Sequence, residues 1–137
     1  MIVGIDIGGS TTDAVILENG SIRVVTIEAN DPVAAAAGAL GKIVGDAGIS
    51  LSDIECVAAT GAGSRALGDH LFGRPVLKVN EFTAIGVGGT SLAGKDRALV
   101  VSLGTGTAIV SVNKTEIRHV SGCLLYTSSD SVCPARR

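Results

Sequence analysis

A glycine- and threonine-rich turn between two apolar strands occurs twice in this chain, and this repeat restricts the fold more than any other feature. The first copy is Ile5–Thr12 (IDIGGSTT) and the second is Val101–Thr107 (VSLGTGT). When the copies are aligned, strand, turn and hydroxyl recur in the same order, with Asp6 opposite Ser102, Gly8 opposite Gly104 and Thr11 opposite Thr107. We interpret the repeat as a duplicated unit whose second half is cut short.

The residue types of both turns fit the binding of phosphate. Glycine has no Cβ and accepts a positive φ, so backbone N–H groups are able to surround phosphate oxygens. A simple hairpin is the alternative for each turn alone, but two matching copies favour phosphate binding. The residues expected to bind ATP phosphates are Gly8, Gly9, Ser10, Thr11, Thr12, Gly104, Thr105, Gly106 and Thr107.

Asp6 lies at the carboxyl end of an apolar strand, just before the first glycines. Because Mg²⁺ keeps most of its hydration shell and takes few protein carboxylates, we expect Asp6 to hold Mg²⁺ through water. Successive side chains of a strand point to opposite faces, so Asp13 shares the face of Thr11. This parity favours a metal-linked role for Asp13 as well.

Hydrophobic periodicity and turn residues predict an α/β chain with the order βββαβαβα in its first domain. A helix is expected from a cap at Asn30 or Asp31, with Pro32 at its first position, to Gly48. A second helix is expected from the Gly61–Gly63 turn to about Phe72, and a third begins at Glu81. The predicted strands are 2–7, 12–18, 21–28, 54–59, 76–79, 98–102, 107–112 and 116–120.

The same motifs resemble the amino-terminal half of the type II (fumble-like) pantothenate kinases. The resemblance covers residues 1–122 and is carried by four segments, Gly4–Thr11, Val79–Ala84, Val101–Ala108 and His119–Gly122. It implies the actin-like ATPase (ribonuclease H-like) fold. We therefore expect a first actin-like domain at 1–94 and the start of a truncated second domain at 95–122.

The resemblance also implies an activity, which is ATP- and Mg²⁺-dependent phosphorylation of pantothenate to 4′-phosphopantothenate, the first step of coenzyme A biosynthesis. In the family the Glu of a Glu-Phe pair is the general base for the pantothenate hydroxyl, and the matching residue here is Glu81. A carboxylate that only complements the helix dipole is the alternative for Glu81. The resemblance further implies a homodimer formed through the second domain.

Two positions depart from the family pattern. Asp13 stands where the family usually has Lys, and His119, beside Arg118, stands where it usually has an Arg that binds the substrate carboxylate. The segment around Asp13 is similar instead to the start of hydantoinase and oxoprolinase subunits and of activator ATPases. An activator-type ATPase or a hydantoinase- or oxoprolinase-like subunit therefore remains an alternative to the kinase. A third alternative is an inactive actin-like binding module.

Composition places the chain among cytoplasmic globular proteins. With 46% hydrophobic residues, a net charge of −2 and no basic patch, the sequence argues against disorder and nucleic-acid binding. No apolar run reaches the ~20 residues of a membrane span, and no signal peptide is recognised. The three cysteines, Cys56, Cys123 and Cys133, lack metal-ligand spacing.

The segment 123–137 breaks the hydrophobic pattern of the preceding strands. Residues 123–128 (CLLYTS) resemble the translation of a transposon-end sequencing adapter, so we interpret 123–137 as a read-through tail that is not native. Its alternative is a genuine irregular extension. On the first interpretation the chain is a fragment that lacks the rest of its second domain, and we expect the fragment alone to be inactive.

Overall fold

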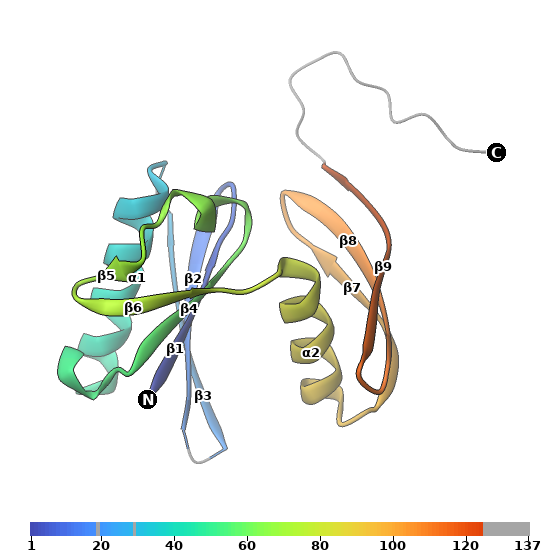
Figure 1. The fold of residues 1–137 in the computed structure, drawn as a ribbon, viewed down its shortest axis with the longest axis horizontal. Coiled ribbons are helices and arrows are strands. Elements are labelled where there is room, and N and C mark those ends of the chain that lie inside the picture. The colour runs from blue at the N-terminus through green and yellow to red at the C-terminus, as the bar shows by residue number, and fades with distance from the viewer. Residues whose placement is uncertain (19, 29, 125–137) are drawn as a thin grey trace. The chain divides into compact units, whose positions relative to one another are not determined.

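The computed structural model describes residues 1–18, 20–28 and 30–124. They form two compact units, one from Met1 to Asn80 and one beginning at Glu81 (Figure 1). Most of the segment interpreted as a read-through tail, residues 125–137, lies outside the described residues. No helix among the described residues has the length and apolar character that crossing a membrane requires.

The first unit is built on a six-stranded sheet of order β3-β2-β1-β4-β6-β5. β1, β2 and β3 form an antiparallel meander, while β4 pairs in parallel with β1 and β6 in parallel with β4. The strands are β1 (Ile2–Ile7), β2 (Thr11–Glu18), β3 (Ser21–Glu28), β4 (Cys56–Thr60), β5 (His70–Leu71) and β6 (Arg74–Lys78). The first three strands confirm the sequence expectation within one residue.

Helix α1 (Pro32–Ala47) covers one face of this sheet (Figure 1). The Asp31 side chain caps it by accepting from Ala34 N at 2.7 Å, and Gly48 ends it with a φ of 66°. Both ends are those that the sequence predicted. Leu40 and Ile43 are fully buried in one core cluster with apolar residues of β1, β2 and β4. Full burial of such a side chain contributes about 1.5–3 kcal/mol.

The opposite face of the sheet carries the alternate residues of each strand. Ile2, Leu17 and Leu77 on this face are 56%, 68% and 60% exposed. In contrast, Val3, Ile5 and Ile7 on the α1 face are at most 1% exposed. The strand alternation therefore divides β1 into a core side and an open side that carries Asp6.

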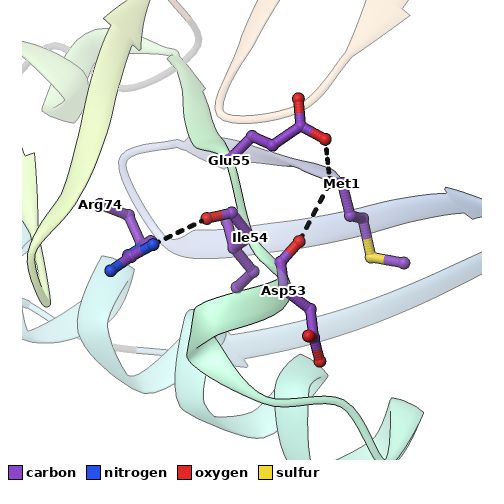
Figure 2. Close-up of polar contacts among 5 residues, drawn as sticks. All are labelled: Met1, Asp53, Ile54, Glu55 and Arg74. Atoms are coloured by element: carbon purple, nitrogen blue, oxygen red, sulfur yellow. Dashed lines mark hydrogen bonds and ion pairs between the residues drawn. The ribbon is translucent and has the colours of Figure 1, made fainter.

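The amino terminus is held by β4 and the residues before it (Figure 2). The Met1 ammonium donates to Asp53 O at 3.0 Å and to Glu55 Oε1 at 2.6 Å. The hydrogen bond from the Met1 ammonium to Glu55 Oε1 lowers the pKa of Glu55, and the positive charge of the ammonium lowers it further. Beside it, Arg74 Nη1 donates to Ile54 O at 3.2 Å and ties β6 to the same segment.

The second unit packs helix α2 (Glu81–Ala93) on an antiparallel sheet of order β7-β8-β9. A Cβ at Gly89 would lie 2.5 Å from Val100 Cγ1, and one at Gly86 would lie 3.0 Å from Val112 Cγ2. The absence of a side chain at these two glycines therefore leaves room for strand side chains. The strands are β7 (Arg97–Leu103), β8 (Gly106–Asn113) and β9 (Glu116–Leu124).

One segment differs from the sequence expectation. The helix predicted from Gly61 to about Phe72 is a short 3₁₀ helix, η2 (Ala62–Ala66), followed by the β5–β6 hairpin. Phe72 and Gly73, with φ of 49° and 75°, form the tight turn of that hairpin and exclude a helix there. Helix α2 packs on β7, β8 and β9 and forms one compact unit with them.

Candidate functional site

The first predicted phosphate loop is a tight hairpin between β1 and β2. Gly8 N donates to Thr11 O at 2.9 Å, and Ile7 pairs with Thr12. Neither Gly8 nor Gly9 has a positive φ, so the conformational reason that we expected for these glycines is wrong. Gly8 is needed for space, because a Cβ there would lie 3.0 Å from Thr11 O.

An open hollow of about 570 Å³ adjoins this hairpin. Its lining includes two residues that the sequence did not indicate, Glu28 at the end of β3 and Asn30. Glu28 is the cross-strand partner of Thr11, which explains why it reaches the loop. The remaining lining residues are Gly9, Ser10 and Thr11.

The hydroxyl groups of the loop point to different sides. Ser10 is exposed and Thr11 half-buried, whereas Thr12 is only 2% exposed and lies on the core face with Ile7. A phosphate outside the loop would therefore not meet the Thr12 side chain. The Thr12 hydroxyl, predicted from the sequence as a phosphate ligand, is therefore turned into the core.

A polar row crosses the open face of the sheet at the end of β1. Asp6 pairs with Asp13 of β2 on one side and with Thr60 of β4 on the other. Asp13 in turn pairs with Thr26, whose Oγ1 donates to Asp13 Oδ1 at 2.5 Å. Asp6 and Asp13 thus lie on the same face of neighbouring strands.

The composition of this row fits Mg²⁺, which in nucleotide sites is bound by one or two carboxylates together with substrate phosphates. Thr60 Oγ1 is buried and has no hydrogen-bond partner, so a polar atom beside Asp6 still has hydrogen-bonding capacity. The described residues contain no group of three or more His, Cys, Asp or Glu side chains arranged to hold a metal by themselves. Asp6 and Asp13 would hold Mg²⁺ here only together with phosphate or water.

The Gly61–Ser64 segment, which the sequence indicated only as a connection, lies against the end of β1. Gly61 has a φ of 82°, and a Cβ there would be 2.3 Å from Asp6 Oδ1 and 2.5 Å from Ile7 O. A Cβ at Gly63 would be 2.3 Å from Ile7 Cγ2. The missed signal was a Gly-x-Gly sequence directly after a buried strand that pairs with β1.

The second predicted phosphate loop is the β7–β8 turn of the second unit. Gly104 N donates to Gly106 O at 2.8 Å, and Leu103 pairs with Thr107. Neither glycine has a positive φ. Thr105 and Thr107 are both half-buried.

Glu81 is the first residue of α2 and is exposed. Its neighbour Phe82 stacks on His119 of β9, with ring centroids 4.0 Å apart and an interplanar angle of 20°. His119 pairs with Val110, on the sheet face toward α2. The structure therefore brings His119 to the start of the helix that carries Glu81.

Arg118 is turned to the other face of β9, where it pairs with Ser111. Its Nε and Nη2 donate to Glu116 Oε1 at 3.0 Å and 2.5 Å. The predicted pair of substrate-binding residues is thus divided between the two faces of the sheet.

Comparisons with solved structures identify proteins of similar fold. The chain superposes with a TM-score of 0.70 and 21% identity on the activator of 2-hydroxyisocaproyl-CoA dehydratase from Clostridium difficile with bound ADPNP, over 87% of this chain and 45% of that one. Component A of (R)-2-hydroxyglutaryl-CoA dehydratase from Acidaminococcus fermentans gives 0.69 and 17%, over 87% and 46%. A ROK family glucokinase from Streptomyces griseus, in complex with glucose and AMPPNP, gives 0.60 and 18%, over 90% and 47%.

These structures belong to the actin-like ATPase superfamily, and the chain has the actin-like ATPase fold, as the sequence predicted. The chain spans less than half the length of each of them. No protein-family model matches the sequence. No curated protein matches it significantly.

Proposed function

We propose that the complete protein is an ATP-dependent kinase that phosphorylates pantothenate to 4′-phosphopantothenate. The observation that carries the nucleotide part is the glycine hairpin at Gly8–Thr11 with Asp6 and Asp13 on one face at its base. The fold supports this part, because the activator and the glucokinase named above were solved with ADPNP and AMPPNP. Pantothenate as the acceptor rests on the sequence resemblance alone.

In the proposed reaction, Glu81 accepts the proton of the substrate hydroxyl as the hydroxyl oxygen attacks the γ-phosphorus of ATP and ADP leaves. The backbone N–H groups of both loops stabilise charge on the phosphate oxygens, together with the hydroxyls of Ser10, Thr11, Thr105 and Thr107. When bound, Mg²⁺ neutralises phosphate charge, and Asp6 and Asp13 are the residues that would hold it. His119, beside the helix start, is the candidate for contact with the substrate carboxylate.

Arg118 enters this proposal only if its pair with Glu116 opens, because that pair lies on the other face of β9. We further propose that the complete protein acts in the cytoplasm as a homodimer. These assignments rest on the sequence.

An activator-type ATPase is the second candidate, and a specific observation favours it. Asp13 lies on the same face as Asp6, where the kinase pattern would place a Lys. Two of the solved structures named above are such an activator and a dehydratase component. In this reaction water would replace the alcohol as the phosphoryl acceptor.

The test is to follow labelled γ-phosphate of ATP in the complete gene product with pantothenate present. The kinase proposal expects the label on pantothenate. Label on inorganic phosphate alone would replace the kinase with the ATPase. Retention of all label on ATP, with or without pantothenate, would leave a binding module and overturn both catalytic proposals.

A further inference from the structure

The turn of residues Gly61–Ser64, hereafter the Gly61 turn, is held rigidly by its own hydrogen bonds. Ser64 is 8% exposed, and its Oγ and N both donate to Gly61 O, at 2.7 Å and 3.1 Å. Leu67 N donates to Ser64 O at 3.2 Å and closes the next turn. The conformation is therefore a defined 3₁₀ segment.

Lys78 fastens this segment to the sheet. It is the last residue of β6 and pairs with Ala59 of β4, the strand that leads into the turn. Its Nζ donates to Ser64 O and, at 2.8 Å, to Leu67 O. A cation at the carbonyl end of a helical turn also compensates the partial negative charge of those carbonyls.

Gly61, the first residue of the turn, lies against the carboxylate of Asp6. A single added carbon at Gly61 would come within 2.3 Å of Asp6 Oδ1, so the backbone there already limits where that oxygen lies. Thr60, next to Gly61, is the cross-strand partner of Asp6. The Asp6 carboxylate thus lies beside a backbone segment whose position depends on Lys78.

We propose that Lys78 is a positioning residue for the nucleotide site: by holding the Gly61 turn against Asp6, it fixes the carboxylate that receives Mg²⁺·ATP. The proposal rests on the nucleotide part of the proposed function. An outer-shell group that is hydrogen-bonded to a metal ligand typically changes metal affinity by about 10–100-fold. Lys78 acts one step further out, through the Gly61 turn, so its effect is expected at the lower end of that range. Lys78 therefore acts on the metal-dependent part of ATP binding and leaves the metal-independent part in place.

The experiment measures the dissociation constant of a fluorescent ATP analogue for the complete gene product, once with Mg²⁺ and once with EDTA. The quantity of interest is the ratio of the two constants, because a general loss of folded protein changes both alike. Lys78→Met keeps the aliphatic stem but removes the donors. We expect Lys78→Met to reduce the Mg²⁺ enhancement of ATP binding about tenfold and to change binding in EDTA less than about twofold. Lys78→Arg, which keeps a charged donor, should retain the wild-type enhancement.

A glycine pair gives a second, independent arm. Gly61→Ala introduces a methyl group 2.3 Å from Asp6 Oδ1 and 2.5 Å from Ile7 O. Gly73→Ala has a similar φ, 75° against 82°, with nothing within 4 Å of the added carbon. Both substitutions carry the strain of a positive φ. We expect the Mg²⁺ enhancement to fall in Gly61→Ala and to stay at the wild-type value in Gly73→Ala.

The outcomes separate this proposal from the proposed function. Wild-type protein whose ATP binding shows no Mg²⁺ enhancement would overturn both. Wild-type enhancement that Lys78→Met retains would overturn the positioning role alone. Equal weakening of binding with Mg²⁺ and with EDTA, accompanied by a lower urea midpoint, would show that Lys78 only stabilises the fold, and it too would overturn the positioning role.

Discussion

Adjacent glycines on α2 allow the packing of the second unit to be tested with a matched pair of variants. At Gly88 an added Cβ meets nothing within 4 Å, whereas at Gly89 it would lie 2.5 Å and 2.8 Å from the two methyl groups of Val100. Both changes to Ala remove the cost of a helical glycine, about 1 kcal/mol. Only Gly89→Ala also forces α2 away from β7, and overpacking of this kind costs about 1–3 kcal/mol.

We therefore expect Gly88→Ala to raise the free energy of unfolding by up to about 1 kcal/mol. The free energy of unfolding of Gly89→Ala should be about 1–3 kcal/mol lower than that of Gly88→Ala. With a urea m-value of about 2 kcal/mol/M, that difference separates the two midpoints by about 0.5–1.5 M. Circular dichroism at 222 nm follows the transition, because the unit contains a helix. Equal midpoints for the two variants would refute the close contact between Gly89 and Val100.

Three further outcomes are expected. Glu81→Gln should lower phosphoryl transfer by about 10²–10⁴-fold with little change in ATP affinity, and unchanged turnover would leave Glu81 as a helix-start carboxylate. Asp13→Lys should reduce the Mg²⁺ dependence of ATP binding, whereas superimposable Mg²⁺ titrations would place Asp13 outside the site. The Met1 ammonium lowers the pKa of Glu55 in the folded protein. Wild type should therefore be more stable to urea than Glu55→Gln at pH values above the pKa of Glu55 in the unfolded chain, and it should lose that advantage as the pH falls through the pKa of Glu55 in the folded protein. A stability difference that does not change with pH would contradict an ion pair between Met1 and Glu55.

Features determined by neighbouring residues were predictable from the sequence. Asp31, Pro32 and Gly48 determine both ends of α1 locally, through a side-chain cap, a preset φ and a left-handed terminus. The meander of β1, β2 and β3 follows from alternating apolar residues and short turns. The shared face of Asp6 and Asp13 follows from the same alternation.

Features that depend on distant residues were missed. The segment after Gly61 is not a long helix, because contacts with Ile7 and Asp6 on one side and with Lys78 on the other determine its path. A short segment rich in Gly and Ala has no local pattern that reveals such partners. The opposite faces of Arg118 and His119, however, could have been predicted from the sequence, because successive residues of a strand point to opposite sides of the sheet.

The parallel pairing of β1 with β4 has a consequence for synthesis on the ribosome. The first strand emerges early, but the strand that completes its other side ends at Thr60, after the meander and α1. At elongation rates of about 5–20 residues per second, one edge of β1 waits roughly 3–10 s for its partner. During that interval the nascent chain exposes an unpaired apolar edge, the kind of surface that chaperones bind and that misassembles with other chains.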